Sequence, residues 1–267
     1  MSFNLKIYQQ ELTKLATVYK LNPVDLYVFE IIPSTNQKIL SLIDEGKSLP
    51  IAAIALQQTS GTGQWGRTWQ SSLGGLYLSV AIRPNISLDD SWHLIMATAW
   101  GIAKRLRNLN IPVSLKWPND LILQNRKLGG IKIETRTSKG KIKYAVIGVG
   151  INWTNPVPEL GINLQSYLQE QERTSITCLE QLTAITIQGI LSGYRHYLDN
   201  GGCQILANYE KMLTSIGQEV TVNNYLGVVT GVTIQGALKV RLQSPGASTE
   251  ICLSPGQISL GYPQCDK

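Results

Sequence analysis

The sequence predicts an α+β protein in which a larger domain of strands and helices is followed by a small all-β domain. Helical apolar spacing alternates with short apolar runs typical of strands over most of the chain. After Gly217 only short β-type segments remain, and Asn223-Asn224 and Gly236 separate some of them. We therefore expect two domains, residues 1–214 and 215–267.

Helices and strands can be assigned along the chain from the spacing of apolar residues. We expect helices over residues 5–19, 35–45, 89–109, 179–198 and 205–213. We expect strands in the larger domain over residues 26–32, 51–56, 76–82, 121–123, 127–134 and 141–152, with a polar connection over 154–177. The segments 219–222, 226–234, 237–242, 250–253 and 257–260 should form a small barrel.

The composition is that of a folded protein, because 43% of the 267 residues are hydrophobic and 16% are charged. The net charge of +6 comes from scattered lysines and arginines, which favours anionic small molecules at least as much as nucleic acid. No apolar run approaches the length of about 18 residues that a membrane helix needs, and a secretory signal is not evident. We therefore expect a cytoplasmic protein without membrane contact.

The four cysteines do not predict a metal site or a disulfide framework. They stand far apart in the sequence, without a C-x-x-C pair, at Cys178, Cys203, Cys252 and Cys265. We expect free thiols and no metal bound by protein side chains.

A glycine-rich loop, GTGQWGRTWQSSLGG, begins at Gly61. Its literal G-x-G-x-x-G does not predict a dinucleotide site, because Gly66 opens no helix and no acidic residue stands about twenty positions on. A Walker loop is excluded as well, since no Gly-Lys-Ser/Thr follows. What remains is a flexible loop with one cation, Arg67, and the indoles of Trp65 and Trp69. Such a loop can fold over a ligand with its N–H groups facing phosphate.

The segment LKWPNDLILQNRKLGG, residues 115–130, combines a turn with a β-hairpin. Pro118 suits a stiff turn because its φ is fixed and it has no N–H. The pair Gly129-Gly130 indicates a bulge, or a place where something approaches the backbone closely, beside Lys127. Taken alone, the segment fits a decorated surface hairpin as well as a binding site.

Two further stretches carry both a structural and a functional interpretation. The tetrapeptide Ser34-Thr35-Asn36-Gln37 reads as a capping box, in which Ser34 and Gln37 satisfy helix N–H groups. Its polar groups could instead meet an anion at that helix N-terminus. In the apolar strand over residues 146–151, Gly148 and Gly150 remove side chains from one face, where a flat ligand could lie.

Five motifs, taken together in this order and spacing, resemble those of biotin–protein ligase from about residue 34 onward. They are Ser34-Thr35-Asn36, Gln58-Thr59-Ser60-Gly61 with the loop to Trp69, Lys116-Trp117-Pro118-Asn119-Asp120, Lys127-Leu128-Gly129-Gly130 and Gly148-Val149-Gly150-Ile151-Asn152. The resemblance implies a mixed β-sheet packed with helices, followed by an SH3-like β-barrel.

The resemblance also implies an ATP-dependent reaction in two steps. The carboxylate of biotin attacks the α-phosphate of ATP to give biotinyl-AMP and pyrophosphate, and a lysine of a biotin carboxyl carrier domain then attacks that anhydride. Mg²⁺ accompanies the nucleotide and is held mainly by its phosphates. The enzyme could act as a monomer or a homodimer.

Roles for individual residues follow from the matching motif positions. The resemblance gives a catalytic role to Lys127 and Arg67. It places biotin against Ser34, Thr35, Asn36, Gln58, Gly61, Thr62, Gly63, Gln64, Lys127, Gly130, Gly148 and Gly150. It places ATP against Arg67, Lys116, Asn119, Asp120, Lys127 and Asn152. Cations are needed because a carboxylate and a phosphate repel each other as they meet.

The loop departs from the common family pattern Gly-Arg-Gly-Arg-Arg-Gly-Arg. Thr62, Gln64 and Trp65 stand where that pattern has arginines. A charge-assisted hydrogen bond contributes roughly 1.5 to 3 kcal/mol. We therefore expect biotinyl-AMP to be retained more weakly than by the arginine-bearing loop.

Three alternatives bear on the function. Some relatives carry an N-terminal helix-turn-helix and act as repressors, but the residues before Ser34 are too few for that module, so we expect the short form without DNA binding. A lipoate or octanoate attachment enzyme of related fold would want a nucleophilic cysteine in the pocket, whereas all four cysteines lie downstream of the motifs. A non-catalytic biotin sensor would have lost turnover through the loop substitutions.

Overall fold

The computed structural model describes residues 3–19, 24–244 and 247–262 of the 267-residue chain. The larger domain contains α1 (Leu5–Tyr19), β1 (Asp25–Ile32), α2 (Thr35–Asp44), β2 (Ile51–Gln58), β3 (Leu76–Ile82), α3 (Ser91–Asn108), β4 (Ser114–Lys116), β5 (Asp120–Leu123), β6 (Arg126–Ser138), β7 (Lys141–Ile151), α4 (Leu164–Glu170) and α5 (Leu179–Glu210). Two short 3-10 turns, η1 (Gln64–Gly66) and η2 (Leu88–Asp90), precede β3 and α3. The C-terminal domain contains β8 (Glu219–Val222), β9 (Tyr225–Val232), β10 (Leu238–Ser244) and β11 (Ala247–Leu253).

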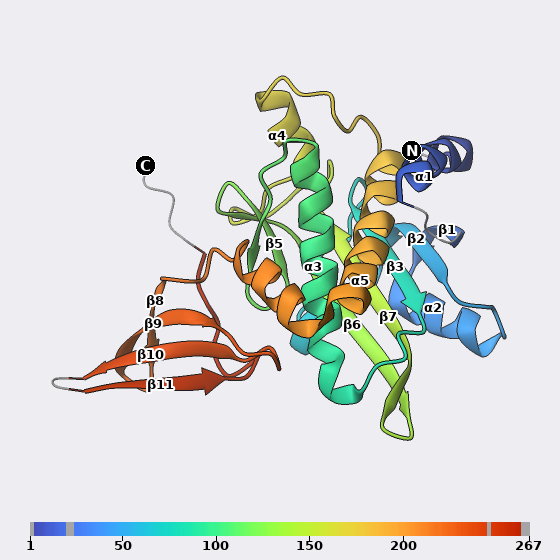
Figure 1. Cartoon of the computed structure of the whole chain (residues 1–267). Coiled ribbons are helices and arrows are strands. Elements are labelled where there is room, and N and C mark those ends of the chain that lie inside the picture. The colour runs from blue at the N-terminus through green and yellow to red at the C-terminus, as the bar shows by residue number, and fades with distance from the viewer. Residues whose placement is uncertain (1–2, 20–23, 245–246, 263–267) are drawn as a thin grey trace.

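The larger domain is built on a seven-stranded mixed sheet in the order β1-β2-β3-β7-β6-β5-β4 (Figure 1). Only β1 and β2 pair in parallel, and the remaining neighbours are antiparallel. In the C-terminal domain, β8 to β11 form an antiparallel sheet in the order β11-β10-β9-β8. The predicted fold class, a mixed sheet with helices followed by an SH3-like domain, is confirmed.

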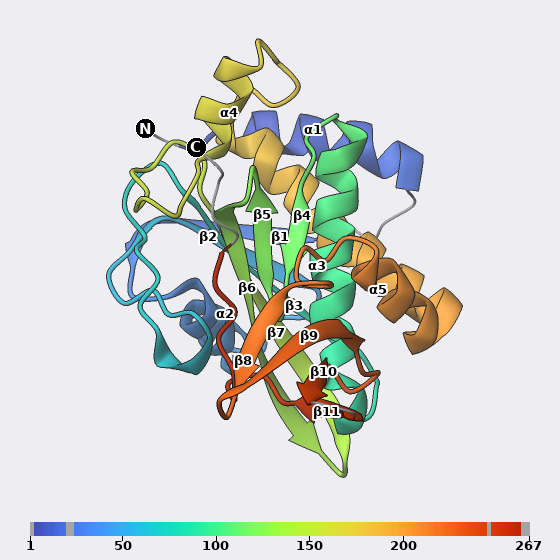
Figure 2. The ribbon, with the colours of Figure 1, turned by 90° about the vertical axis from the view of Figure 1, so that its left-hand side faces the viewer.

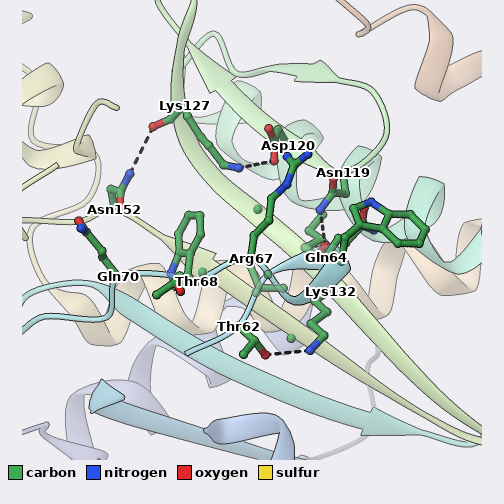
Figure 3. A pocket seen from close by; sticks show the side chains of 18 of the residues that line it. Thr62, Gln64, Arg67, Thr68, Gln70, Asn119, Asp120, Lys127, Lys132 and Asn152 are labelled. Carbon is green, nitrogen blue, oxygen red and sulfur yellow. Dashed lines mark hydrogen bonds and ion pairs between the residues drawn. The ribbon is translucent and has the colours of Figure 1, made fainter. Parts of the chain in front are cut away.

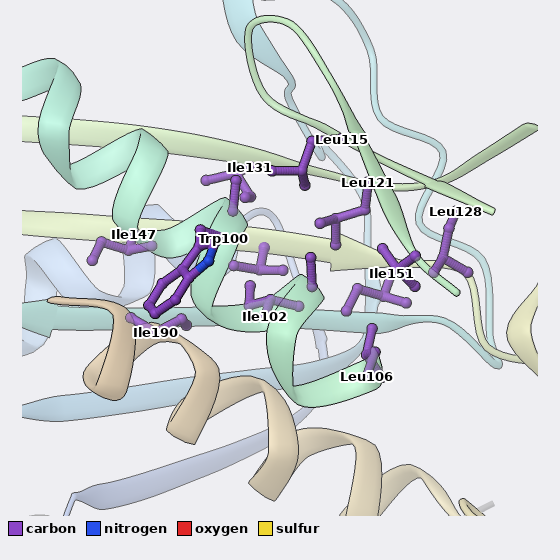
Figure 4. Close-up of a cluster of buried hydrophobic side chains, with 14 of the residues drawn as sticks. Trp100, Ile102, Leu106, Leu115, Leu121, Leu128, Ile131, Ile147, Ile151 and Ile190 are labelled. Carbon is purple, nitrogen blue, oxygen red and sulfur yellow. The ribbon is translucent and has the colours of Figure 1, made fainter. Parts of the chain in front are cut away.

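Helices cover both faces of the large sheet (Figure 2). On one face α3 and α5 lie side by side, and their apolar side chains pack on those of the central strands (Figure 4). The two helices approach closely at Gly193 of α5, which has no side chain. A Cβ at this position would overlap the carbonyl oxygen of Ala97 in α3. On the other face α2 packs through Ile39 and Leu42.

The sequence-based assignment fails at four places. The short edge strand β4 was not expected. The predicted connection contains the short helix α4. The two predicted C-terminal helices of the larger domain form one element, α5, which is interrupted at Gly201, where φ is 79° and ψ is 173°. Residues 257–260, expected as a fifth β segment, form a turn and coil instead.

Several smaller expectations can be compared with the described residues. The predicted bulge is confirmed, because the pairing of β5 with β6 shifts register between Leu121 and Ile122. Cys178, Cys203 and Cys252 are free thiols, whereas Cys265 lies outside the described residues. Within the described ranges, no helix combines the length and apolar character needed to cross a membrane.

Candidate functional site

A cavity of about 490 Å³ opens at the end of the sheet between the glycine loop and the β5–β6 hairpin (Figure 3). It brings together almost all the residues that the sequence singled out. Those lining it are Ser34, Thr35, Asn36, Gln58, Thr62, Gly63, Gln64, Arg67, Lys116, Asn119, Asp120, Lys127, Gly130, Gly148, Gly150 and Asn152. Gly61 is outside the lining: it is buried behind the loop, where a Cβ would lie 2.6 Å from the carbonyl oxygen of Trp69.

An ion pair stands at the centre of the cavity. The Lys127 Nζ lies 2.7 Å from Asp120 Oδ1, and the hydroxyl of Tyr262 donates to Asp120 Oδ2 at 2.7 Å. The Lys127 Nζ also lies 5.3 Å from the centre of the Trp69 ring. Arg67 extends toward Asp120 from the glycine loop (Figure 3). One carboxylate therefore orients the central cation while a second cation approaches it.

Lys116 is a buried cation on the same side of the cavity. Burial lowers the pKa of Lys116, Asp120 opposes this shift, and the neighbouring Lys127 and Arg67 add to it. Its Nζ lies 4.0 Å from the centre of the Tyr262 ring. Burial also raises the pKa of Tyr262, whose neighbour Asp120 acts in the same direction. Tyr262 therefore remains a neutral hydrogen-bond donor at physiological pH.

Two asparagines brace the backbone that carries Lys127. Asn119 Nδ2 donates to the carbonyl oxygen of Ile131 at 2.6 Å, and Asn152 Nδ2 donates to the carbonyl oxygen of Lys127 at 3.3 Å. Asn155 Nδ2 in turn donates to Asn152 Oδ1 at 3.1 Å. The amides of Asn119 and Asn152, which both line the cavity, are thus fixed against β6.

The predicted capping box is wrong, because its side chains serve another purpose. Ser34 occupies the N-cap position of α2, but its side chain makes no capping hydrogen bond. The N–H of Thr35 donates instead to Gln58 Oε1 at 2.8 Å, across 23 residues of sequence. Gln58 Nε2 donates to the hydroxyl of Ser71 at 2.9 Å. The helix N-terminus is therefore tied to β2 rather than capped locally.

Ser79 completes this polar network from beneath the cavity. Its fully buried hydroxyl lies 2.6 Å from Asn36 Oδ1 and 2.7 Å from Thr35 Oγ1. The single hydroxyl hydrogen of Ser79 goes to Asn36 Oδ1, which can only accept, and the Thr35 hydroxyl has one hydrogen to share between Ser79 Oγ and Gln58 Oε1, which lies 3.1 Å away. This arrangement fixes the Asn36 amide with its oxygen toward Ser79. Sequence reasoning missed Ser79, which reads as an ordinary residue of a buried strand.

Side chains of the protein pack against the two glycines of β7, so these glycines do not form a bare open face. A Cβ at Gly148 would overlap the amide of Asn36, and one at Gly150 would lie 2.5 Å from Trp69 Nε1. Trp69 Nε1 and Gln64 Oε1 are buried without a hydrogen-bond partner among the described residues. Buried polar groups are normally paired, so these two wall atoms are exceptions among the described residues.

The glycine loop folds as a tight turn over the cavity. The N–H of Gly63 donates to the carbonyl oxygen of Arg67 at 2.7 Å, and Thr62 and Thr68 form an antiparallel bridge. At the tip, Trp65 has a φ of 58°, which is uncommon for a bulky residue, and its side chain is 61% exposed. The loop is therefore shaped by its own backbone bonds and projects an indole at the mouth of the cavity.

Three parts of the wall were not predicted from the sequence. Residues 156–161 of the connection contribute to it, because the N–H of Lys127 donates to the carbonyl oxygen of Leu160 at 2.8 Å. The C-terminal segment 256–262 contributes Tyr262. Lys132 of β6 also lines the cavity. Only Lys132 carried a local signal, since it alternates with apolar neighbours that face the core.

Comparison with known proteins identifies relatives of this chain. Residues 28–152 match the model of the biotin/lipoate A/B protein ligase family. The chain is 34% identical over 217 residues to the bifunctional ligase/repressor BirA of Escherichia coli (strain K12), covering 79% of this chain and 67% of that protein. It is 27% identical over 223 residues to the biotin–[acetyl-CoA-carboxylase] ligase of Mycobacterium tuberculosis, covering 77% and 79% respectively.

A solved structure has the same fold. The biotin protein ligase from Aquifex aeolicus, in complex with biotin and ATP, superimposes with a TM-score of 0.69 at 24% identity, covering 89% of this chain and 99% of that one. The 34% identity to the Escherichia coli protein, over two thirds of its length, shows that the chain belongs to the biotin protein ligases of the biotin/lipoate A/B protein ligase family.

Proposed function

We propose that this chain is an ATP-dependent ligase that activates biotin as biotinyl-5′-AMP and transfers it to a lysine of a biotin carboxyl carrier domain. One observation carries the proposal. The ammonium of Lys127, held 2.7 Å from Asp120, lies in one cavity with the polar network at Thr35 and Gln58 and with the buried cation Lys116. The cavity thus offers a polar end, a cationic end and a lysine that can serve both.

The first step joins two anions, and the cations of the site explain how. The biotin carboxylate oxygen attacks the α-phosphorus of ATP, an O–P bond forms, and pyrophosphate leaves with the electrons of the bond that breaks. Lys127, Arg67 and Lys116 would stabilise the charge on the phosphoryl oxygens as they approach the carboxylate. Asp120 holds Lys127 in place before the substrates arrive, so little reorganisation is needed.

We assign the ring system of biotin to the end of the cavity near α2. There Thr35, Asn36 and Gln58 supply amide and hydroxyl groups in fixed orientations. Ser34 belongs to the same end, and Gly130, Gly148 and Gly150 lie along its floor. A ring that carries both N–H and C=O groups suits such a mixed set of donors and acceptors.

We assign the nucleotide to the end of the cavity near the C-terminal segment. Arg67, Lys116, Asn119, Asp120 and Asn152 gather there around Lys127. Mg²⁺ would be held mainly by the nucleotide phosphates, because Asp120, the one carboxylate among the described lining residues, is already bonded to Lys127 and Tyr262. Within the described residues, no group of three or more His, Cys, Asp or Glu side chains gathers as for a metal ion. Bound there, the ion would neutralise phosphate charge.

The second step transfers the acyl group. The neutral amine of the carrier lysine attacks the carbonyl carbon of the anhydride, an amide bond forms as the nitrogen loses a proton to solvent, and AMP leaves with the electrons of the broken C–O bond. A relative named biotin–[acetyl-CoA-carboxylase] ligase supports a carboxylase carrier as the partner. We propose that the reaction takes place in the cytoplasm, where ATP and the carrier meet.

A single assay separates this function from its alternatives. The chain is incubated with ATP, Mg²⁺, a carrier domain and either biotin or lipoate, and the mass of the carrier is measured. We expect the mass of one biotinyl group to be added and no addition with lipoate. Lipoylation would identify a lipoate attachment enzyme. Biotin binding without any mass gain would identify a non-catalytic sensor.

A further inference from the structure

Lys132 is a pocket cation outside the motifs that carry the family resemblance. In β6 its neighbours Ile131 and Ile133 face the hydrophobic core, so the alternation of the strand turns Lys132 toward the opposite face. Its Cα partner across the sheet is Gly148 of β7, which has no side chain to obstruct it. Lys132 is shown pointing to the glycine loop in Figure 3. Its side chain is 27% exposed.

The Lys132 ammonium is held by two contacts. Its Nζ donates to Thr62 Oγ1 at 2.8 Å and lies 2.9 Å from Glu134 Oε1. An ammonium has three N–H donors, so these bonds among the described residues leave one for a ligand. The Thr62 oxygen accepts from Lys132, so its own hydrogen can be donated as well. Lys132 and Thr62 together present two adjacent donors at the cavity wall.

The charge balance of the cavity favours an anion at these donors. Among the residues that the structure describes, those that are charged and line the cavity are Arg67, Lys116, Asp120, Lys127 and Lys132. The one carboxylate among them is engaged by Lys127, so it does not neutralise Lys132. Glu134 pairs with Lys132 from outside the lining and is partly exposed, which weakens that pair through solvent screening. An anionic oxygen in the cavity would therefore compete well for Lys132.

We propose that Lys132, together with Thr62, binds an anionic oxygen of the activated acid, either the biotin carboxylate or the phosphate of biotinyl-AMP. This inference rests on the proposed function. Lys132 of β6 places a cation beside Thr62, an uncharged residue of the glycine loop. Lys132 would hold the acyl adenylate in place and tie the glycine loop to the sheet while it is bound.

The test measures ligand retention and ligand affinity in matched variants. In Lys132→Leu, biotinyl-AMP should leave roughly ten times faster, because a charge-assisted hydrogen bond is lost. Lys132→Arg keeps the charge and should stay within about twofold of the native rate. Lys143→Leu removes an exposed lysine of the adjacent strand and should leave the rate unchanged. Thermal unfolding of each variant checks the fold, and Lys132→Gln replaces Lys132→Leu if the latter does not fold.

Two further arms separate the sources of the oxygen. Calorimetric titration with biotin and with biotin methyl ester needs no catalysis. Weaker binding of biotin alone by Lys132→Leu would identify the carboxylate as the partner, whereas unchanged biotin affinity with faster adenylate release would identify the phosphate. Adding Thr62→Arg to Lys132→Leu should restore retention, because a cation returns to the same place from the loop.

The inference is overturned by unchanged release and unchanged biotin affinity in Lys132→Leu. Equal losses in Lys132→Leu and Lys132→Arg would also overturn it, because they would indicate a requirement for shape rather than charge. Failure of the native chain to form biotinyl-AMP would contradict the proposed function instead. In that case the biotin and methyl ester titrations still decide whether Lys132 binds a carboxylate.

Discussion

The ammonium of Lys127 and the carboxylate of Asp120 stand 2.7 Å apart, on the two strands of one hairpin. Tyr262 donates to the other oxygen of that carboxylate from the far end of the chain. The hairpin and the C-terminal segment therefore meet at a single side chain. Asp120 sets the position of the lysine to which we assign the chemistry, and Tyr262 fixes Asp120 in turn.

Lys116→Met should stabilise the fold at neutral pH and remove the activity. Burial lowers the pKa of Lys116 from its ordinary 10.5, so the unfolded chain holds that proton more tightly than the folded chain does. The charged lysine therefore costs stability below its folded pKa, and the cost declines as the pH rises toward 10.5. We expect a gain of about 1 kcal/mol at neutral pH and a smaller gain in alkali, measured by urea unfolding. A gain that grows with pH would contradict this account.

Ser79→Ala should weaken biotin binding without any contact between Ser79 and the ligand. The change removes the donor that orients Asn36 and leaves a buried amide oxygen unpaired, which costs about 1 to 3 kcal/mol of stability. Calorimetry should show lower biotin affinity, whereas Ser79→Thr, which keeps the hydroxyl, should recover part of it. Ser166→Ala on the exposed side of α4 is the control and should change neither quantity. Native biotin affinity in Ser79→Ala would show that Asn36 needs no such orientation.

Gly193→Ala should destabilise the larger domain through the contact between its two main helices. The added methyl group would overlap the carbonyl oxygen of Ala97, so α5 must move away from α3 at a cost of about 1 to 3 kcal/mol. Gln204→Ala, at an exposed position of the same helix, should stay within about 0.5 kcal/mol of the native chain. Equal unfolding midpoints for the two variants would mean that the helices are not closely packed.

Thr62→Arg should slow the release of biotinyl-AMP. A guanidinium at this loop position would add a charge-assisted bond to the bound anion, although the like charge of Lys132 beside it reduces the gain. We expect roughly threefold slower release in low salt, measured by displacement of the labelled adenylate. Release that is unchanged or faster in the variant would refute the idea that the arginine-poor loop limits retention.

Much of this architecture could be predicted because it is coded locally. The strand that carries Gly148 and the hairpin that carries Lys127 are marked by apolar periodicity and by turn residues. Almost all the residues singled out by the five motifs line one cavity of the structure. The roles of these residues in binding and catalysis stay predictions.

What could not be predicted depends on partners distant in the sequence. Ser34 and Gln37 fit the sequence pattern of a capping box. The N–H of Thr35 donates instead to Gln58 of β2, so a side-chain amide distant in the sequence replaces the local cap. Tyr262 reaches the site only because the C-terminal domain folds back on the hairpin, which no periodicity records. Ser79 could not be predicted because its partner Asn36 lies 43 residues away in the sequence and meets it only in the folded chain.

The central claim is that biotin and ATP react at Lys127, and biotin-dependent release of pyrophosphate tests it most directly. The native chain should release pyrophosphate only when biotin, ATP and Mg²⁺ are all present. Lys127→Ala should lower that rate by at least about a thousandfold, because the cation that meets both reacting groups is gone. Its unfolding midpoint should stay near the native value, since the Lys127 side chain is 32% exposed and the buried Asp120 keeps its hydrogen bond from Tyr262. A near-native rate in Lys127→Ala, or no biotin-dependent release from the native chain, would contradict the account.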